Sequence, residues 1–263
     1  MSKIGTLFSG STGNCTYISS GNDGILVDAG TSCKQILTAL EDNYIDINSI
    51  RGIFITHTHS DHIKGLRVLL SKHNVPVYGS KETLGTLLLQ GALADGKNQY
   101  FDIENTKEPG LDIRAKFFRT SHDCEGSGGY VFTLKDGERV AVCTDLGFVD
   151  DNIRNCLLGC RAVVLESNHD VGMLQNGHYP FETKQRILGK EGHLSNIGCA
   201  QELPALVDGG TTHIILAHLS RDNNTPDLAR VTAESTLAVK GMKNGIDYSL
   251  SVAPRCSSKI IYI

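Results

Sequence analysis

Short apolar segments typical of β-strands alternate with helical segments through most of the chain. This alternation restricts the fold to the α/β classes, and we expect two mixed β-sheets flanked by helices. The predicted strands are 15–19, 24–30, 52–56, 75–79, 111–120, 128–134, 138–145, 161–168, 213–220, 246–252 and 259–263. The predicted helices are one capped by Thr31, 61–73, one through Leu84 and Leu88, 181–189, 195–206 and 226–240.

The composition is that of a globular protein, with 40% hydrophobic residues and a formal net charge of −4. This charge argues against coating nucleic acid by broad attraction, but it permits a local basic groove. No two of the eight cysteines form a CxxC pair, and Cys156 and Cys160 are expected to be small buried side chains in a reducing compartment. Without a signal-peptide segment or a long apolar run, the sequence predicts a cytoplasmic protein with no membrane insertion.

The sequence HTHSDH directly follows the predicted strand 52–56. His57 and His59 project to one side of an extended chain, because side-chain direction alternates along it. Asp61 and His62 follow at the turn into a helix, so one pair can hold a cation while the other pair faces a second cation. Imidazole with carboxylate suits zinc, manganese or iron. A lone histidine is usually structural, but burying these four groups without a metal would be costly.

Three further strands end in residues that can bind a metal, namely His122, Asp145 and His218. Each of these positions alone is a weak signal. Together with HTHSDH, and in this order along the chain, they form a specific pattern. Polar residues that follow strands are where α/β enzymes commonly carry their chemistry, so we expect the four segments to meet at one site.

The pattern resembles the metallo-β-lactamase superfamily, and Asp28-Ala29-Gly30 matches the DxG motif of that superfamily. Longer segments resemble its YycJ/WalJ branch, also called VicX, which contains bacterial nuclease-like proteins related to RNase Z and cyclic phosphodiesterases. These segments are FSGSTGN at 8–14, ESNHD at 166–170, HYPFETKQRILGKEGHLSN at 178–196 and AHLSRDNN at 217–224. The resemblance implies a single domain over residues 1–263 with a four-layered αββα sandwich.

The resemblance also implies roles for individual residues. One metal would be bound by His57, His59 and His122. The other would be bound by Asp61, His62 and His218. Asp145 would bridge the two metals, and Asp28 would orient ligand imidazoles. Lactamases of this superfamily usually carry cysteine at the position of Asp145, and this departure favours phosphodiester chemistry over lactam hydrolysis.

The expected function is therefore a metal-dependent phosphodiesterase with two divalent ions, zinc or manganese, with iron as a third option. The resemblance favours a nuclease that acts as a 5′→3′ exonuclease, on DNA rather than RNA, by attack of a metal-activated hydroxide. Two alternatives stay open, namely a thioester or lactam hydrolase and a regulatory protein of cell-wall two-component signalling. A homo-oligomer is also left open.

His193 is the first candidate to protonate the leaving group, beside Asp61 as a catalytic carboxylate. The rival acid is His169, with Asn168 next to it as a phosphate contact. Ser195 either binds phosphate or simply caps the helix 195–206.

Further substrate contacts are expected at exposed or loop positions. The candidates are Ser11, Asn14, Arg221 and Lys184. For the two basic residues, a solvated surface charge is the simpler interpretation. We also expect His59, Asp61 and Asp145 to lie at strand ends with access to water.

Overall fold

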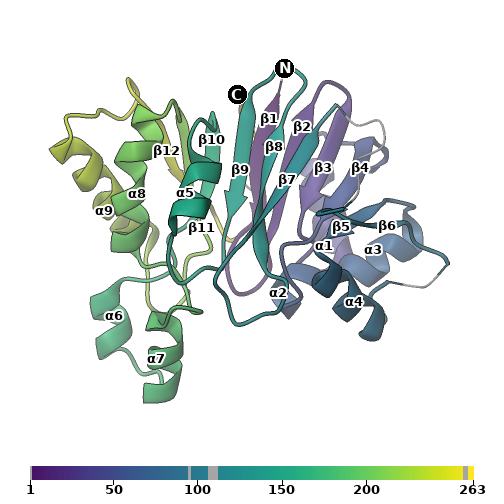
Figure 1. Ribbon diagram of the computed structural model, residues 1–263, viewed down its shortest axis with the longest axis horizontal. Coiled ribbons are helices and arrows are strands. Elements are labelled where there is room, and N and C mark those ends of the chain that lie inside the picture. Colours follow the sequence, from purple (N-terminus) through teal and green to yellow (C-terminus); the bar gives the residue numbers. More distant parts are fainter. Residues whose placement is uncertain (1, 94–95, 106–111, 257–259) are drawn as a thin grey trace.

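Two β-sheets pack face to face in the computed structural model, and helices cover both outer faces (Figure 1). The structure describes residues 2–93, 96–105, 112–256 and 260–263. Within these residues the first sheet has the order β13 (Ile261–Tyr262), β1 (Lys3–Phe8), β2 (Cys15–Ser20), β3 (Asp23–Val27), β4 (Ile50–Phe54), β5 (Val77–Gly79) and β6 (Tyr100–Asp102). The second sheet has the order β12 (Ser249–Val252), β11 (His213–Ala217), β10 (Ala162–Glu166), β9 (Arg139–Cys143), β8 (Gly128–Thr133) and β7 (Arg114–Arg119).

The helices divide between the two outer faces, which confirms the predicted αββα architecture. On the first sheet lie α1 (Cys33–Asp42), a 3-10 turn (Ile47–Ser49), α3 (Leu66–Lys72) and α4 (Lys81–Leu89). The second sheet is covered by α5 (Asp151–Leu157), α8 (Asn196–Asp208) and α9 (Pro226–Val239). The short helices α2 (Ser60–Ile63), α6 (Val171–Asn176) and α7 (Phe181–Leu188) lie at one edge of the sandwich (Figure 1).

Strand alternation explains the layers. On β4, Phe54 points between the sheets and stacks on Tyr78 with ring centroids 4.6 Å apart. It also meets Tyr130 of the second sheet edge-on at 5.5 Å. Its neighbours Ile53 and Ile55 point the other way and pack under α1, α3 and α4. Because side chains alternate along a strand, one apolar run supplies both cores.

The parallel strands bring the site together. Strands β3 to β6 are parallel in the first sheet, and β9 to β12 are parallel in the second. The segments that follow β3, β4, β9, β10 and β11 meet at the edge where α2, α6 and α7 lie (Figure 1). Ligand sites form outside the carboxyl ends of strands in open α/β sheets.

Several predicted boundaries were wrong for local reasons. The cap of α1 is Ser32, whose Oγ accepts from Gln35 N, rather than Thr31. The predicted helix 61–73 divides into α2 and α3 around Gly65, where the chain passes close to the Thr31 carbonyl. The sequence did not predict β1, β6, α5 or α6.

Further predictions concern two strands, two cysteines and membrane insertion. The predicted strands 111–120 and 259–263 begin at residues outside the described part of the chain, and their described parts contain β7 and β13. Cys156 and Cys160 are buried free thiols, as expected. Among the described residues, no helix combines the length and the apolar character needed to cross a bilayer.

Candidate metal centre and active site

Three site residues lie in left-handed turns directly beyond strands. Asp28, Asp145 and His218 have φ angles of 64°, 60° and 56°, and among the described residues Tyr44 is the only other non-glycine with positive φ. This conformation costs roughly 1–3 kcal/mol for a non-glycine residue and persists where the surroundings enforce it. Two of these turns direct the Asp145 carboxylate and the His218 imidazole into the same cavity, and the third directs the Asp28 carboxylate to His62 Nδ1.

The first ligand group contains His57, His59 and His122, which each offer a nitrogen within 4.8 Å of the others. The His122 Nδ1–H donates to the Gly192 carbonyl at 3.1 Å, so its Nε2 lone pair faces His59 Nδ1 at 3.3 Å. The Nε2 of His57 is buried and has no hydrogen-bond partner. Burial and neighbouring imidazoles hold the pKa of His57 well below its usual value, so it carries the neutral ring that binds metals.

The second group contains Asp61, His62 and His218. Asp61 Oδ2 lies 3.5 Å from His218 Nε2 and 3.6 Å from His62 Nε2. Asp145 is the seventh candidate ligand and lies between the two groups. Its Oδ2 is 3.3 Å from His62 Nε2, and its Oδ1 is 3.8 Å from His122 Nε2.

Asp145 is only 2% exposed, so the expectation of water access was wrong for this residue; His59 and Asp61 are partly exposed. The Oδ2 atom of Asp145 is buried without a hydrogen-bond partner. Buried polar atoms are normally paired. Two such unpaired atoms, one on Asp145 and one on His57, face the space between the ligand groups, and divalent cations fit this donor set. The fold and the histidine–aspartate cluster therefore imply divalent metal binding.

Asp28 lies against His62, as the sequence analysis expected. Its Oδ2 accepts from His62 Nδ1 at 2.8 Å, and its Oδ1 accepts from Thr56 N at 2.8 Å. These bonds leave His62 Nε2 directed at the second ligand group. Burial lowers the pKa of His62, but the carboxylates of Asp145 and Asp28 outweigh it and raise the value to about 9.

The sequence analysis gave no role to Glu166, which ends β10 and is fully buried. Its Oε1 accepts from His218 Nδ1 at 2.7 Å and from His193 Nδ1 at 2.9 Å. Its Oε2 accepts from the backbone N–H groups of Leu146 and Leu194. Burial opposes ionisation, but the two imidazoles lower the pKa of Glu166 below its usual range. An acidic residue that ends the apolar run AVVLE was the signal available in the sequence.

His193 shares a cavity of about 330 Å³ with the metal-binding groups, including Asp61, Asp145 and His218. Its Nδ1 is held by Glu166, so its Nε2 is the nitrogen available to a ligand. Burial lowers the pKa of His193, but the Glu166 carboxylate outweighs it and raises the value. The geometry therefore places this imidazole where a general acid is needed, and Glu166 favours its protonated form.

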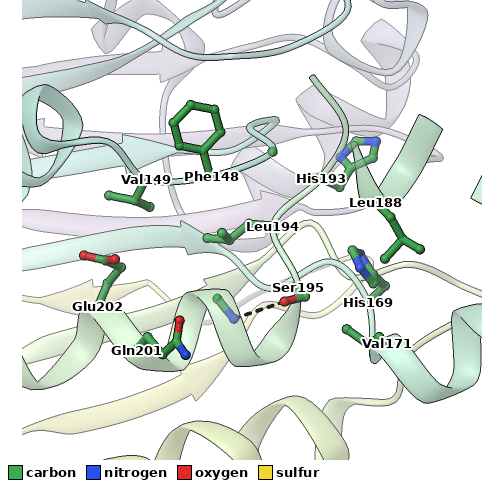
Figure 2. A pocket seen from close by; sticks show the side chains of 12 residues that line it. Phe148, Val149, His169, Val171, Leu188, His193, Leu194, Ser195, Gln201 and Glu202 are labelled. Carbon is green, nitrogen blue, oxygen red and sulfur yellow. Dashed lines mark hydrogen bonds between the residues drawn. The ribbon is translucent and has the colours of Figure 1, made fainter. Parts of the chain in front are cut away.

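His169 does not line this cavity. It lines a second one, of about 250 Å³, which His193 also borders (Figure 2). Burial lowers the pKa of His169 to about 4, so its ring holds no extra proton near neutral pH. The geometry favours His193 over His169 as the acid.

The proposed substrate contacts have different surroundings. Ser11 and Asn168 line the metal-site cavity. Ser195 lines the second cavity and caps α8, because its Oγ accepts from Gly198 N at 3.0 Å, as the simpler interpretation predicted. Asn14 is buried, and its Nδ2 lies 3.2 Å from Asp61 Oδ2 and 3.0 Å from His62 Nε2, so it contacts metal-binding residues.

The basic residue that lines the cavity is neither of the two candidates named from the sequence, for which a solvated surface charge was the simpler interpretation. Arg186 of α7 lines it and forms a 2.6 Å ion pair with Asp123, whereas Arg221 is exposed and is not among its lining residues. Lys184 donates to the Gln175 carbonyl. The sequence did not single out Arg186, because its position beside the cavity depends on how α7 folds over the sheet edge.

Comparison with known proteins agrees with this geometry. A model of the β-lactamase superfamily domain matches residues 24–219. Exodeoxyribonuclease YycJ of Bacillus anthracis is 38% identical over 259 residues, which cover 98% of this chain and 97% of that protein. The chain belongs to the YycJ/WalJ family of the metallo-β-lactamase superfamily. Exodeoxyribonuclease WalJ of Streptococcus pneumoniae is 35% identical over 257 residues, covering 95% of each protein.

A solved structure extends the likeness of this YycJ/WalJ-family chain to the fold. The metallo-β-lactamase fold protein YhfI from Bacillus subtilis superposes with a TM-score of 0.71 at 16% identity, covering 99% of this chain and 98% of that one. At this level of identity the match concerns the fold alone. The candidate metal-binding residues, together with Glu166 and His193, lie within the matched superfamily domain, whereas Ser11 and Asn14 precede it.

Gly30 of the superfamily DxG motif allows close packing beneath the candidate metal site. A Cβ at this position would lie 1.6 Å from the Asp61 carbonyl oxygen. We expect Gly30→Ala to lower the free energy of unfolding by at least about 1–3 kcal/mol, the usual cost of overpacking, and to displace Asp61. Urea denaturation and metal content measure both effects.

Gly85 provides the matched control, because a Cβ there would have no neighbour within 4 Å and the residue lies inside α4. Gly85→Ala should raise stability by about 0.5–1 kcal/mol. Equal stability changes for the two variants would contradict the packing argument.

Proposed function

We propose that the chain is a phosphodiesterase that uses two divalent metal ions and acts as an exonuclease on DNA, with 5′→3′ polarity and a cytoplasmic location. The single observation that carries the proposal is the pair of ligand groups that share Asp145, beside an imidazole held by Glu166. The two relatives named exodeoxyribonucleases support the choice of substrate. The aspartate where related lactamases carry cysteine supports phosphodiester rather than lactam chemistry.

The residues of the chain divide into those that would hold metal and those that act on the substrate. His57, His59 and His122 would hold one ion, and Asp61, His62 and His218 the other, with Asp145 between them. Bound zinc, manganese or iron would neutralise charge on the phosphate and lower the pKa of water.

His193 acts on the leaving group. Because Nδ1 donates to Glu166, Nε2 is the ring nitrogen left for the substrate, and His193 lines the same cavity as the candidate ligands Asp61, Asp145 and His218. As the phosphorus–oxygen bond breaks, this imidazole supplies the proton that the departing oxygen needs. Ser11 and Asn168 lie where they can contact the nucleotide, and Arg186 brings positive charge to the same cavity.

The test is a substrate panel with metal-loaded protein whose metal content is measured. The panel contains 5′-labelled single- and double-stranded DNA, RNA, bis-p-nitrophenyl phosphate, a thioester and nitrocefin. Stepwise release of nucleotides from DNA is expected. Turnover of only the thioester or nitrocefin would replace the proposal with another hydrolase, and no turnover at all would favour the regulatory protein.

Glu166→Gln tests the link between His193 and His218. The glutamine has a single acceptor oxygen and an added NH₂ donor, so it cannot accept from both imidazoles and both backbone N–H groups. We expect metal affinity or hydrolysis to fall about 10- to 100-fold, as for other residues that orient metal ligands. Equilibrium dialysis and initial rates measure the two quantities.

Glu41→Gln, at an exposed position on α1, is the control and should behave like the unaltered protein. Unchanged affinity and unchanged rates in Glu166→Gln would show that the bonds of Glu166 serve stability alone.

A further inference from the structure

A second cavity of about 250 Å³ adjoins the metal-site cavity, and His193 borders both of them (Figure 2). Four of the seven candidate metal ligands, namely His59, Asp61, Asp145 and His218, line the first cavity, and none of the seven is among the lining residues of the second. If His193 protonates the leaving oxygen, the group that departs must lie next to His193. The second cavity is therefore placed to receive the leaving group.

The walls of the second cavity suit a flat apolar ligand. Phe148 and Leu188 line it while 42% and 38% exposed, and Val149 and Leu194 add further apolar surface. Figure 2 shows Phe148 on one side and Leu188 on the other, with His193 and His169 beside Leu188. Small-molecule sites commonly combine such walls with a few polar groups that fix orientation.

His169 supplies one of those polar groups. Its side chain is 1% exposed, and neither ring nitrogen has a hydrogen-bond partner. Buried polar atoms without partners are rare, and each one calls for an explanation. A neutral imidazole offers one donor and one acceptor, the combination that the edge of a nucleobase also presents. Gln201 also lines this cavity and contributes a side-chain amide (Figure 2).

The charges in the cavity disfavour a phosphate. Two first-turn N–H groups of α8 are already used, because Asn196 N donates to the His169 carbonyl and Gly198 N donates to Ser195 Oγ. The carboxylate of Glu202 lines the cavity, and Arg154 pairs with it at 2.7 Å without being a lining residue itself. An anion would therefore meet a carboxylate and find two of the first-turn donors already used.

We propose that the second cavity binds the nucleobase of the departing nucleoside, with the base between Phe148 and Leu188 and its edge on His169 and Gln201. The proposal rests on the proposed function, and it makes the base of the leaving nucleoside a determinant of rate. Stacking on an aromatic side chain tolerates every base, which suits an enzyme that degrades any sequence.

The first experiment compares thymidylyl-thymidine with two analogues that each lack one base. The leaving nucleoside is the product that carries no phosphate. Removing its base should lower kcat/KM by about 5- to 150-fold, the range expected from base–aromatic stacking. Removing the other base should have a smaller effect. Equal kcat/KM for thymidylyl-thymidine and the analogue without the leaving base would overturn the proposal.

Two variants test whether the effect of the leaving base on kcat/KM arises in this cavity. In Gln201→Ala and His169→Phe, the ratio of kcat/KM with and without the leaving base should fall towards one. Gln90→Ala, at an exposed position on another helix, should preserve the ratio. Gln201 is itself exposed, so its variant should fold even if His169→Phe does not. An unchanged ratio in Gln201→Ala and in folded His169→Phe would show that the base binds elsewhere.

A binding measurement separates failure of this proposal from failure of the proposed function. Bis-p-nitrophenyl phosphate has no base, so its turnover reports on phosphodiesterase activity alone. Ligand-observed NMR with thymidine, and with deoxyribose as control, reports on the cavity alone. Thymidine binding that weakens in Gln201→Ala supports the cavity assignment even without turnover, and absence of thymidine binding overturns it.

Discussion

Asp145→Ala should nearly abolish hydrolysis, with a loss greater than the about 10²–10³-fold typical of removing one transition-state hydrogen-bond donor. Asp145 lies between the two ligand groups, and its buried Oδ2 accepts no hydrogen bond from the described residues. Removing it takes a ligand from both proposed metals at once. Initial rates on bis-p-nitrophenyl phosphate, metal content and circular dichroism measure activity, occupancy and fold.

The backbone at Asp145 calls for a second variant. Its φ of 60° costs alanine roughly 1–2 kcal/mol, whereas asparagine tolerates this conformation. Asp145→Asn should therefore keep the stability of the fold and still lose most activity. His59→Ala and Asp61→Ala are expected to lose activity as well, while Asp42→Ala, at an exposed position on α1, should not. Full activity in both Asp145 variants would show that the bridging role is wrong.

His193→Ala should retain both metals and lose roughly 10²–10⁴ in rate on an ordinary phosphodiester, the usual contribution of a general acid. The loss should shrink on a p-nitrophenyl ester, because a good leaving group needs little help from a proton. The position supports this expectation, since His193 faces the metal-site cavity and Glu166 holds its Nδ1. Rates on the two ester classes and the metal content provide the measurement.

His169→Ala is the comparison for that experiment. It should show a smaller change that does not depend on the leaving-group pKa, because His169 lies in the second cavity. The reverse pattern would transfer the acid role to His169. Equal losses on both ester classes for His193→Ala would make His193 a phosphate contact, and metal loss would make it a ligand.

The layers of the fold and the candidate metal ligands could be predicted from the sequence. Apolar runs with alternating side chains, such as that of β4, can form buried strands only between two cores, which implies helices outside the sheets. Strand-end residues are local features, so HTHSDH, His122, Asp145 and His218 could be recognised from the sequence alone. The order of these residues was specific enough to indicate the superfamily.

Boundaries and short elements were less predictable. The strand predicted at 24–30 ends at Val27 because Asp28 adopts a left-handed turn that its contacts with Thr56 and His62 hold in place. The helix predicted at 61–73 divides where Gly65 N donates to the Ala29 carbonyl at 2.8 Å instead of to the Asp61 carbonyl. Such boundaries depend on contacts with residues that are distant in sequence. Hydrophobic periodicity carries no information about those contacts.

Only the tertiary structure decided which polar residues act together. Glu166 and His193 are 27 positions apart, and their hydrogen bond exists because β10 ends beside the loop that precedes α8. The same packing keeps His169 out of the cavity that the candidate metal ligands line and places Arg186 at that cavity. Residue type limits the chemistry that a side chain can perform. The packing of strand ends and loops determines which atoms the side chain contacts, and those contacts decide its role.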